Sequence, residues 1–190
     1  MKKLILCVSS ALTAISMMAQ SGVQIGAYYF DGWSGHRPGQ EEWALKTNAP
    51  TGLTYKLMTE YKDREPLWGW RNDDIKIMER QIELAASNGI DFFVFCWYWT
   101  RDSKGNVSDE QVKALPNHTS IDLFMRARNN HKMKFAVLVC DHSGNEVKEQ
   151  GSWNALVQYL SKEYFNHPQY LRFDNKPYLC FFQQNIPDPA

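Results

Sequence analysis

The fold is decided by residues 72–99, which read NDDIKIMERQIELAASNGIDFFVFCWYW. The first half of this stretch has apolar residues at helical spacing, and those on one face are Ile75, Met78, Ile82 and Ala85. Asn72 can cap this helix at its start, and Gly89 ends it. Residues 90–97 then form a nearly continuous apolar run rich in aromatic side chains, which is typical of a strand buried on both faces. The stretch therefore predicts a helix that leads directly into a central strand of a parallel sheet.

Three further apolar runs of the same character occur at residues 23–30, 134–140 and 177–182. Helical patterns at residues 120–131 and 152–166 separate them. The resulting order, β-α-β-α-β-α-β, implies parallel strands joined by right-handed crossovers. We therefore expect an α/β fold of the (β/α)8 TIM-barrel type. Such a barrel typically needs about 250 residues and this chain has 190, so we expect only about the first four βα units, a truncated barrel.

The first 19 residues, MKKLILCVSSALTAISMMA, have the pattern of a secretory signal peptide, with two lysines, a short apolar run and small residues before a cleavage point. We expect a mature domain over residues 20–190 that is secreted or periplasmic and has no membrane contact once the signal is removed. An uncleaved anchor is the alternative. Basic and acidic residues number 21 each, so the chain has no basic field to hold nucleic acid. Hydrophobic residues at 44% and charged residues at 22% exclude wholesale disorder.

Three cysteines follow the signal segment, namely Cys96, Cys140 and Cys180. An odd number without close spacing matches neither a disulfide framework nor a zinc motif. Each lies in an apolar run, which predicts buried free thiols that behave as small hydrophobic groups. A metal site or a catalytic thiol is the alternative, and we expect no cofactor.

The connections from strand to helix are long, at residues 31–72, 98–119 and 141–151, which predicts a site at the C-terminal ends of the strands. Because side chains alternate along a strand, the residues at these ends fall into two layers. One layer contains Asp31, Trp97, Asp141 and Gln183. The other contains Phe30 or Gly32, Tyr98, His142 and Gln184. The residues alone leave open which layer faces the site.

Aromatic residues gather at the same strand ends and in their loops, at Tyr29, Trp33, Trp68, Trp70, Trp97, Tyr98 and Trp99. Aromatic rings pack against the C–H faces of sugars, while Asp and His bond sugar hydroxyls. We therefore predict these substrate-binding residues: Tyr29, Asp31, Trp33, Trp97, Tyr98, Trp99, Asp141 and His142. The alternative is that individual rings fill the lid of a core. Glu146 and Glu149 fit a solvated charge run better than paired catalytic carboxylates, so no catalytic residue is assigned.

Four segments carry a family resemblance: GAYYFDGW (26–33), EPLWGWRNDDIKIMERQIELAASNGIDFFVFCWYW (65–99), KFAVLVCDH (134–142) and YFNHPQYLRFDNKPYLCFF (164–182). Together they resemble the N-terminal half of the bacterial glycoside hydrolase family 99-like group, which includes endo-α-mannosidases, endo-α-mannanases and relatives regarded as polysaccharide-biosynthesis glycosyltransferases. The resemblance implies a (β/α)8 barrel that acts on carbohydrate at its C-terminal strand ends. Relatives often have Asn where this chain has Asp141. The group's catalytic glutamates lie on later strands, and no residue of this chain matches them.

The resemblance implies an exported glycoside hydrolase that cleaves α-mannoside-type glycans with retention, one carboxyl group acting through the sugar 2-hydroxyl. This chain would be a fragment without the catalytic glutamates, inactive by itself. The alternatives are a non-catalytic carbohydrate-binding protein and a glycosyltransferase of polysaccharide biosynthesis. A half-barrel with two unpaired sheet edges could also fail to fold stably. The expected partner is a glycan or polysaccharide, and the residues predict no oligomeric state.

Overall fold

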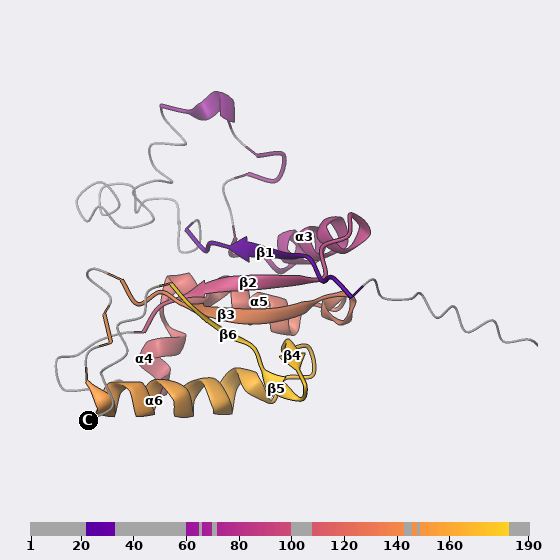
Figure 1. Ribbon diagram of the computed structural model, residues 1–190. Helices are drawn as coiled ribbons and strands as arrows, with labels where there is room; N and C mark the ends of the chain where they lie inside the picture. The colour runs from indigo at the N-terminus through magenta and orange to yellow at the C-terminus, as the bar shows by residue number, and fades with distance from the viewer. Residues whose placement is uncertain are drawn as a thin grey trace, which may run out of the picture.

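A four-stranded parallel sheet forms the centre of the computed structural model (Figure 1). The structure describes residues 22–32, 60–64, 66–69, 72–99, 108–142, 146–147 and 149–182. The strands are β1 (Gly26–Tyr29), β2 (Phe92–Trp97), β3 (Lys134–Val139) and β6 (Leu179–Phe181), and they lie in the order β1-β2-β3-β6. Each neighbouring pair is parallel. The predicted parallel α/β sheet is therefore confirmed, whereas the truncated (β/α)8 barrel stays a prediction.

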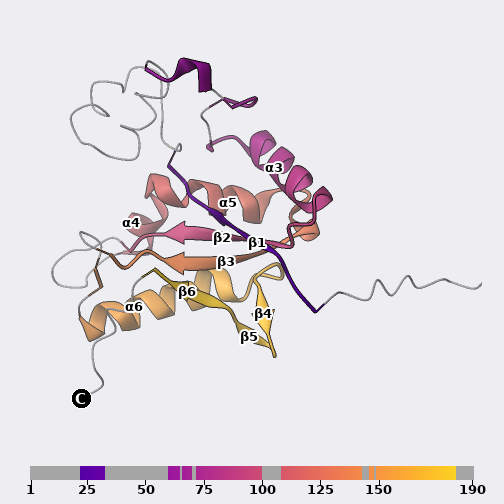
Figure 2. The same ribbon diagram turned by 45° about the horizontal axis from the view of Figure 1, so that its top comes forward.

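Helices cover one face of the sheet. They are α3 (Ile75–Ser87), α4 (Asp109–Lys113), α5 (Thr119–Arg126) and α6 (Gln150–Leu160), the last continued by the π-helix η4 (Ser161–Phe165). Three short 3-10 turns, η1 (Lys62–Arg64), η2 (Pro116–His118) and η3 (Asn130–Lys132), complete the helical segments of the described residues. Helix α3 lies toward the β1 edge and α6 toward the β6 edge, as the two views in Figure 1 and Figure 2 show.

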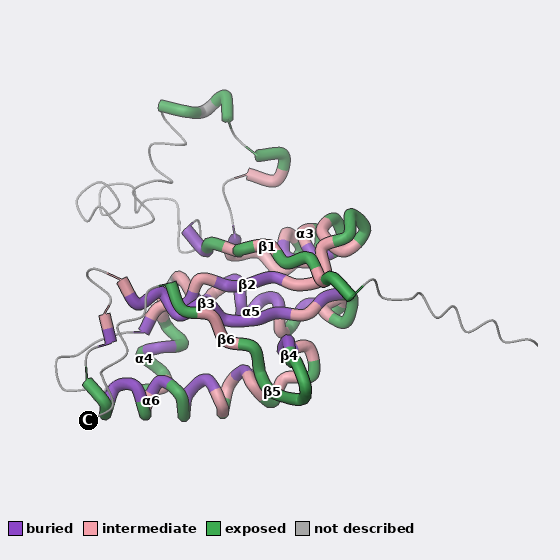
Figure 3. Tube along the Cα trace, in the orientation of Figure 1, coloured by how far each residue is buried: buried purple, intermediate pink, exposed green. Residues whose placement is uncertain are grey.

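The main core lies between the helices and the sheet. Alternate residues of the two central strands enter it, for example Phe93 and Phe95 of β2 and Phe135 of β3, and they meet Met78 of α3 and Leu156 of α6. Figure 3 shows the result, because the central strands are mostly buried while the edge strands are partly exposed. A smaller apolar cluster forms on the opposite face of the sheet, around Val94, Leu138 and Cys140.

The N-cap of helix α3 lies two residues after Asn72, the predicted cap. The Asp74 side chain accepts hydrogen bonds from the main-chain N–H groups of Lys76 and Ile77, so Asp74 is the N-cap. Asn72, the predicted cap, instead directs its side-chain amide to the Asp31 carboxylate at 3.2 Å. The predicted end is confirmed, because Gly89 follows the helix with a φ of 82°, a conformation that suits glycine.

Helix α4 and a β-hairpin were not predicted. Helix α4 starts with a capping box in which Ser108 and Gln111 bond each other's main chain. A β-hairpin interrupts the segment before β6, with β4 (Arg172–Phe173) paired antiparallel to β5 (Lys176–Pro177). Its two turn residues, Asp174 and Asn175, both have positive φ, as a type I′ turn requires.

The predicted signal peptide, residues 1–19, lies outside the described residues. The same is true of Trp33, Trp70, Gln183 and Gln184. Among the helices that the structure does describe, none has both the length and the apolar character that a membrane span requires.

Candidate functional site

Strand register settles which of the two predicted layers faces the helices. Tyr29 pairs with Phe95, and Trp97 pairs with Val139, and all four side chains pack in the core beneath the helices. The layer that contains Asp31, Trp97 and Asp141 therefore points toward the helices. The other layer, which contains Tyr98 and His142, points to the face that the helices leave uncovered.

The predicted aromatic residues on the helix side make core contacts. Trp97 is 0% exposed, and its indole N–H donates to the Tyr164 hydroxyl at 3.2 Å. The ring of Trp99 lies 5.8 Å from that of Trp97, and both are buried. The Tyr29 hydroxyl donates to the Gln81 side-chain carbonyl at 2.7 Å, and burial raises the pKa of Tyr29 to about 12. These three rings thus hold the sheet against its helices.

The two strand-end aspartates bind main-chain N–H groups of later segments. Asp31 is buried and accepts a 2.7 Å hydrogen bond from the N–H of Ser120, in the first turn of α5. Its carboxylate thereby fixes the end of β1 to the positive end of a helix. Asp141 is 0% exposed and accepts a 2.8 Å bond from the N–H of Val147, which ties the chain after β3. Both carboxylates therefore have tertiary hydrogen bonds within the fold, whereas the side chains of Tyr98 and His142 line the face that the helices leave uncovered.

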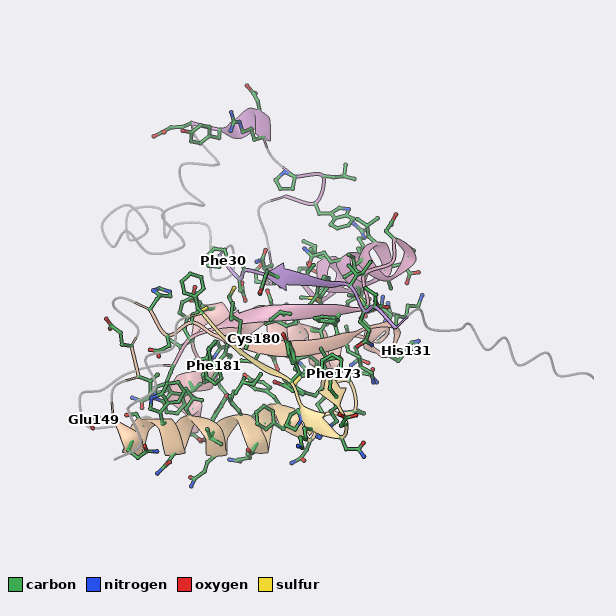
Figure 4. The ribbon with its side chains drawn as sticks, viewed as in Figure 1. Phe30, His131, Glu149, Phe173, Cys180 and Phe181 are labelled. Atoms are coloured by element: carbon green, nitrogen blue, oxygen red, sulfur yellow. The ribbon has the colours of Figure 1, made fainter. Side chains whose placement is uncertain are left out.

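A cavity of about 540 Å³ opens on the face that the helices leave uncovered. It is lined by Tyr28, Phe30, Cys96, Tyr98, Leu138, Cys140, His142, Phe181 and Phe182. Figure 4 shows Phe30 and Phe181 near the ends of β1 and β6, with Cys180 close by on the same strand as Phe181. Tyr28 is 75% exposed and Phe182 is 60% exposed, so solvent-exposed aromatic rings border this cavity.

His142 lies among the aromatic rings of the cavity. Its ring centroid is 6.0 Å from that of Tyr98, perpendicular to it, and 5.4 Å from that of Phe182. Burial raises the pKa of Tyr98, so its phenol stays neutral and can both donate and accept hydrogen bonds. The cavity therefore combines apolar ring faces with the imidazole of His142 and the hydroxyl of Tyr98.

The main chain of Tyr98 is bonded to a buried histidine. The Tyr98 N–H donates to Nε2 of His118 at 3.3 Å, and Nδ1 of the same ring lies 2.7 Å from the carbonyl oxygen of Val112. Because Nε2 accepts, the proton sits on Nδ1 and is donated to Val112. Burial lowers the pKa of His118 to about 4, so the ring is neutral at neutral pH.

Two thiols form part of the cavity wall. Cys96 and Cys140 are free, as predicted, although Cys140 is fully buried and Cys96 only partly. A hydrogen bond between the two side chains lowers the pKa of Cys96 and raises that of Cys140. The described residues contain no group of three or more His, Cys, Asp or Glu side chains placed to hold a metal ion.

Residues 66–190 match the model of a family described as Glycosyltransferase WbsX, and this segment is well over half of the chain. The chain belongs to the glycosyltransferase WbsX family. The predicted relationship to the family 99-like group is thereby confirmed. The matched residues include β2, β3 and β6, whose ends carry most of the cavity.

Individual relatives of this WbsX-family chain are longer than the chain itself. It is 30% identical over 83 residues to the lipopolysaccharide cholinephosphotransferase LicD of Haemophilus influenzae, which is 42% of this chain and 29% of that protein. It also resembles the GH99 endo-α-mannosidase of Bacteroides thetaiotaomicron. One structure, in complex with bis-tris-propane, has 16% identity, a TM-score of 0.47 and coverage of 63% of this chain and 33% of that one. A second has 14% identity, a TM-score of 0.45 and coverage of 62% and 30%.

Several residues of the WbsX-family cavity were absent from the predicted site. Tyr28 and Phe182 lie one residue away from Tyr29 and Gln183, which the prediction placed at the strand ends. For Tyr28 the available signal was its alternation along β1 with the partly buried Ala27 and Tyr29. His118 carries no sequence signal, because its contacts with Trp97 and Tyr98 span about twenty positions of the chain. Trp68 lines a separate cleft of about 230 Å³ beside β1, together with Tyr28 and Phe30.

Proposed function

We propose that this WbsX-family chain binds a glycan in the cavity at the C-terminal ends of its parallel strands. One observation carries the proposal: a cavity of about 540 Å³, walled by aromatic rings, has the Tyr98 hydroxyl and the His142 imidazole among those rings. Pockets for small ligands occupy roughly 300–1,000 Å³ and combine apolar walls with a few polar groups. The C-terminal strand ends are also where parallel α/β folds build their sites.

A sugar presents both kinds of surface that this cavity can recognise. Its C–H faces pack on aromatic rings, and the exposed rings of Tyr28 and Phe182 offer such faces. Its hydroxyls need directional donors and acceptors, which Tyr98 and His142 supply. Membership of a family described as glycosyltransferase supports a carbohydrate ligand over other polar molecules.

The reaction that we propose for the protein is cleavage of an α-mannoside-type glycan with retention. The sequence resemblance to the family 99-like group supports it. Such cleavage needs two carboxyl groups at the scissile bond, one as acid and base and one that assists the sugar. We assign neither group to a residue of this chain, whose part is to bind and orient the glycan.

Glycosyl transfer is the second candidate. The description of the family, glycosyltransferase, supports this candidate. A transferase needs an activated sugar donor, whereas a hydrolase uses water. Product formation that depends on an added nucleotide sugar would favour transfer, and cleavage of a manno-oligosaccharide without a donor would favour hydrolysis.

Binding is testable with the chain itself, by calorimetric titration with α-linked manno-oligosaccharides. Tyr98→Ala should weaken binding about tenfold or more, equivalent to about 1.4 kcal/mol, because truncation of an aromatic wall residue has effects of this size. Phe173→Ala is the matched control, since Phe173 is an exposed ring on the β4–β5 hairpin, away from the cavity (Figure 4). Equal losses in both variants, or no saturable binding at all, would contradict the proposal.

We also propose export, on the pattern of residues 1–19. Expression in a bacterium followed by N-terminal sequencing of the exported protein should give a chain that begins at about Gln20. A chain that keeps Met1 and stays with the membrane fraction would favour the uncleaved anchor instead.

A further inference from the structure

His118 stands on the opposite side of β2 from the cavity. Its ring lies flat against that of Trp97, with centroids 5.0 Å apart and planes 3° apart. Only 2% of the residue is exposed, so a ligand in the cavity has no access to it. His118 does not line the cavity and yet contacts the main chain of a residue that does.

The bonds of His118 connect the cavity wall to a helix. Tyr98 is the first residue beyond β2, where the regular ladder to the neighbouring strands ends. Its N–H donates to Nε2 of His118, whose Nδ1–H donates in turn to the Val112 carbonyl of α4. The imidazole thus joins the end of β2 to α4 through two hydrogen bonds and one stacked ring.

An amide held in this way also fixes the direction of the side chain. The peptide between Trp97 and Tyr98 is planar, so anchoring its N–H limits rotation of that unit. With Trp97 packed on the helix side, the Tyr98 Cα–Cβ bond is directed to the opposite face, where the ring lines the cavity. Removal of the hydrogen-bond acceptor frees the strand end from α4.

We infer that His118 is a positioning residue of the glycan site, because it anchors the Tyr98 main chain and so holds the Tyr98 ring as a wall of the cavity. This inference rests on the proposed function for its effect on ligand binding, but not for its effect on the Tyr98 amide. Binding energy at such a site depends on wall residues that are already ordered before the ligand arrives.

Two substitutions separate the hydrogen bonds from the packing. His118→Phe keeps a flat ring against Trp97 and removes both bonds, and should weaken glycan binding about tenfold through loss of pre-organisation. His118→Gln keeps an oxygen acceptor near the position of Nε2 and should bind the glycan as tightly as the unsubstituted chain. Amide hydrogen exchange at Tyr98 without ligand should be faster in His118→Phe and protected in His118→Gln.

The outcomes distinguish this inference from the proposed function. If Tyr98→Ala loses glycan binding while His118→Phe keeps it in full, the positioning role is overturned. If the unsubstituted chain binds no glycan, the proposed function fails, and exchange at Tyr98 still tests the anchor. Should both His118 variants fail to fold, the ¹⁵N chemical shifts of the His118 ring in the unsubstituted chain show which ring nitrogen carries the proton, and a proton on Nδ1 supports the inference. A proton on Nε2 in place of Nδ1 would overturn the inference.

Discussion

Acidification should destabilise the protein through His118 in particular. Burial lowers the pKa of His118 from an ordinary 6.5 to about 4 in the folded chain. Between these two values the unfolded chain binds a proton that the folded chain excludes, so stability falls as pH falls. Above about pH 6.5 the neutral His118 makes its full contribution to the free energy of unfolding. This contribution falls as pH falls, and at about pH 4 the free energy of unfolding is lower by about 3 kcal/mol, at ~1.36 kcal/mol per pKa unit. Protonation of Nε2 would also confront the Tyr98 N–H with a second donor.

Urea unfolding at several pH values between about 7 and 4.5 measures this effect in the unsubstituted chain and in His118→Phe. The variant is expected to have a lower free energy of unfolding than the unsubstituted chain at neutral pH. The difference between these two free energies should become smaller as pH falls. Lys113, Asp122 and Glu163 line the cleft beside His118 and are present in both proteins, so the difference between the two proteins isolates the imidazole. The exposed His131, substituted by Gln, is the matched control for the removal of a histidine that is not buried. A gap that stays constant with pH would refute the reasoning.

Two further substitutions test the helix-side contacts, and a third tests the turn of the β4–β5 hairpin. Asp31→Ala should lower the unfolding free energy by about 3 kcal/mol, because the buried N–H of Ser120 loses its charged acceptor; a loss below about 1 kcal/mol in urea unfolding would contradict the assignment. Tyr29→Phe removes one hydrogen bond to Gln81 and should cost about 1 kcal/mol in the same assay. Asn175→Val places a β-branched residue at a φ of 63° and should cost about 1–2 kcal/mol in thermal unfolding. An unchanged midpoint of thermal unfolding in Asn175→Val would contradict the type I′ turn at Asp174 and Asn175.

Much of the architecture was predictable because local signals and tertiary structure agree in it. The apolar spacing in α3 and the apolar run of β2 each specify one element, and their tight connection specifies the parallel order. The capping box at Ser108 and the Asp174–Asn175 turn were equally local signals that the prediction did not use. Reading them would have given α4 and the hairpin as well.

The sequence could not predict to which face of the sheet each strand-end side chain points, for a physical reason. Strands of a parallel sheet are apolar on both faces, so they lack the alternation that identifies the buried side of an antiparallel strand. Trp97 and Tyr98 are both large aromatic residues, and nothing local shows that the helices receive the first. The partners of Asp31 and Asp141 are main-chain N–H groups, which leave no mark on the sequence.

Each of three adjacent pairs at the strand ends combines a buried anchor with a residue that lines the cavity. At the end of β2, Trp97 packs under the helices while Tyr98 lines the cavity. After β3, the Asp141 carboxylate bonds Val147 while the neighbouring His142 lines the same cavity. The end of β1 repeats the arrangement, because Asp31 bonds the first turn of α5 beside a cavity-lining phenylalanine. In each pair the cavity-lining side chain is thus one peptide away from a buried anchor. Substitutions on the helix side are therefore expected to alter ligand binding without removing any group that touches the ligand.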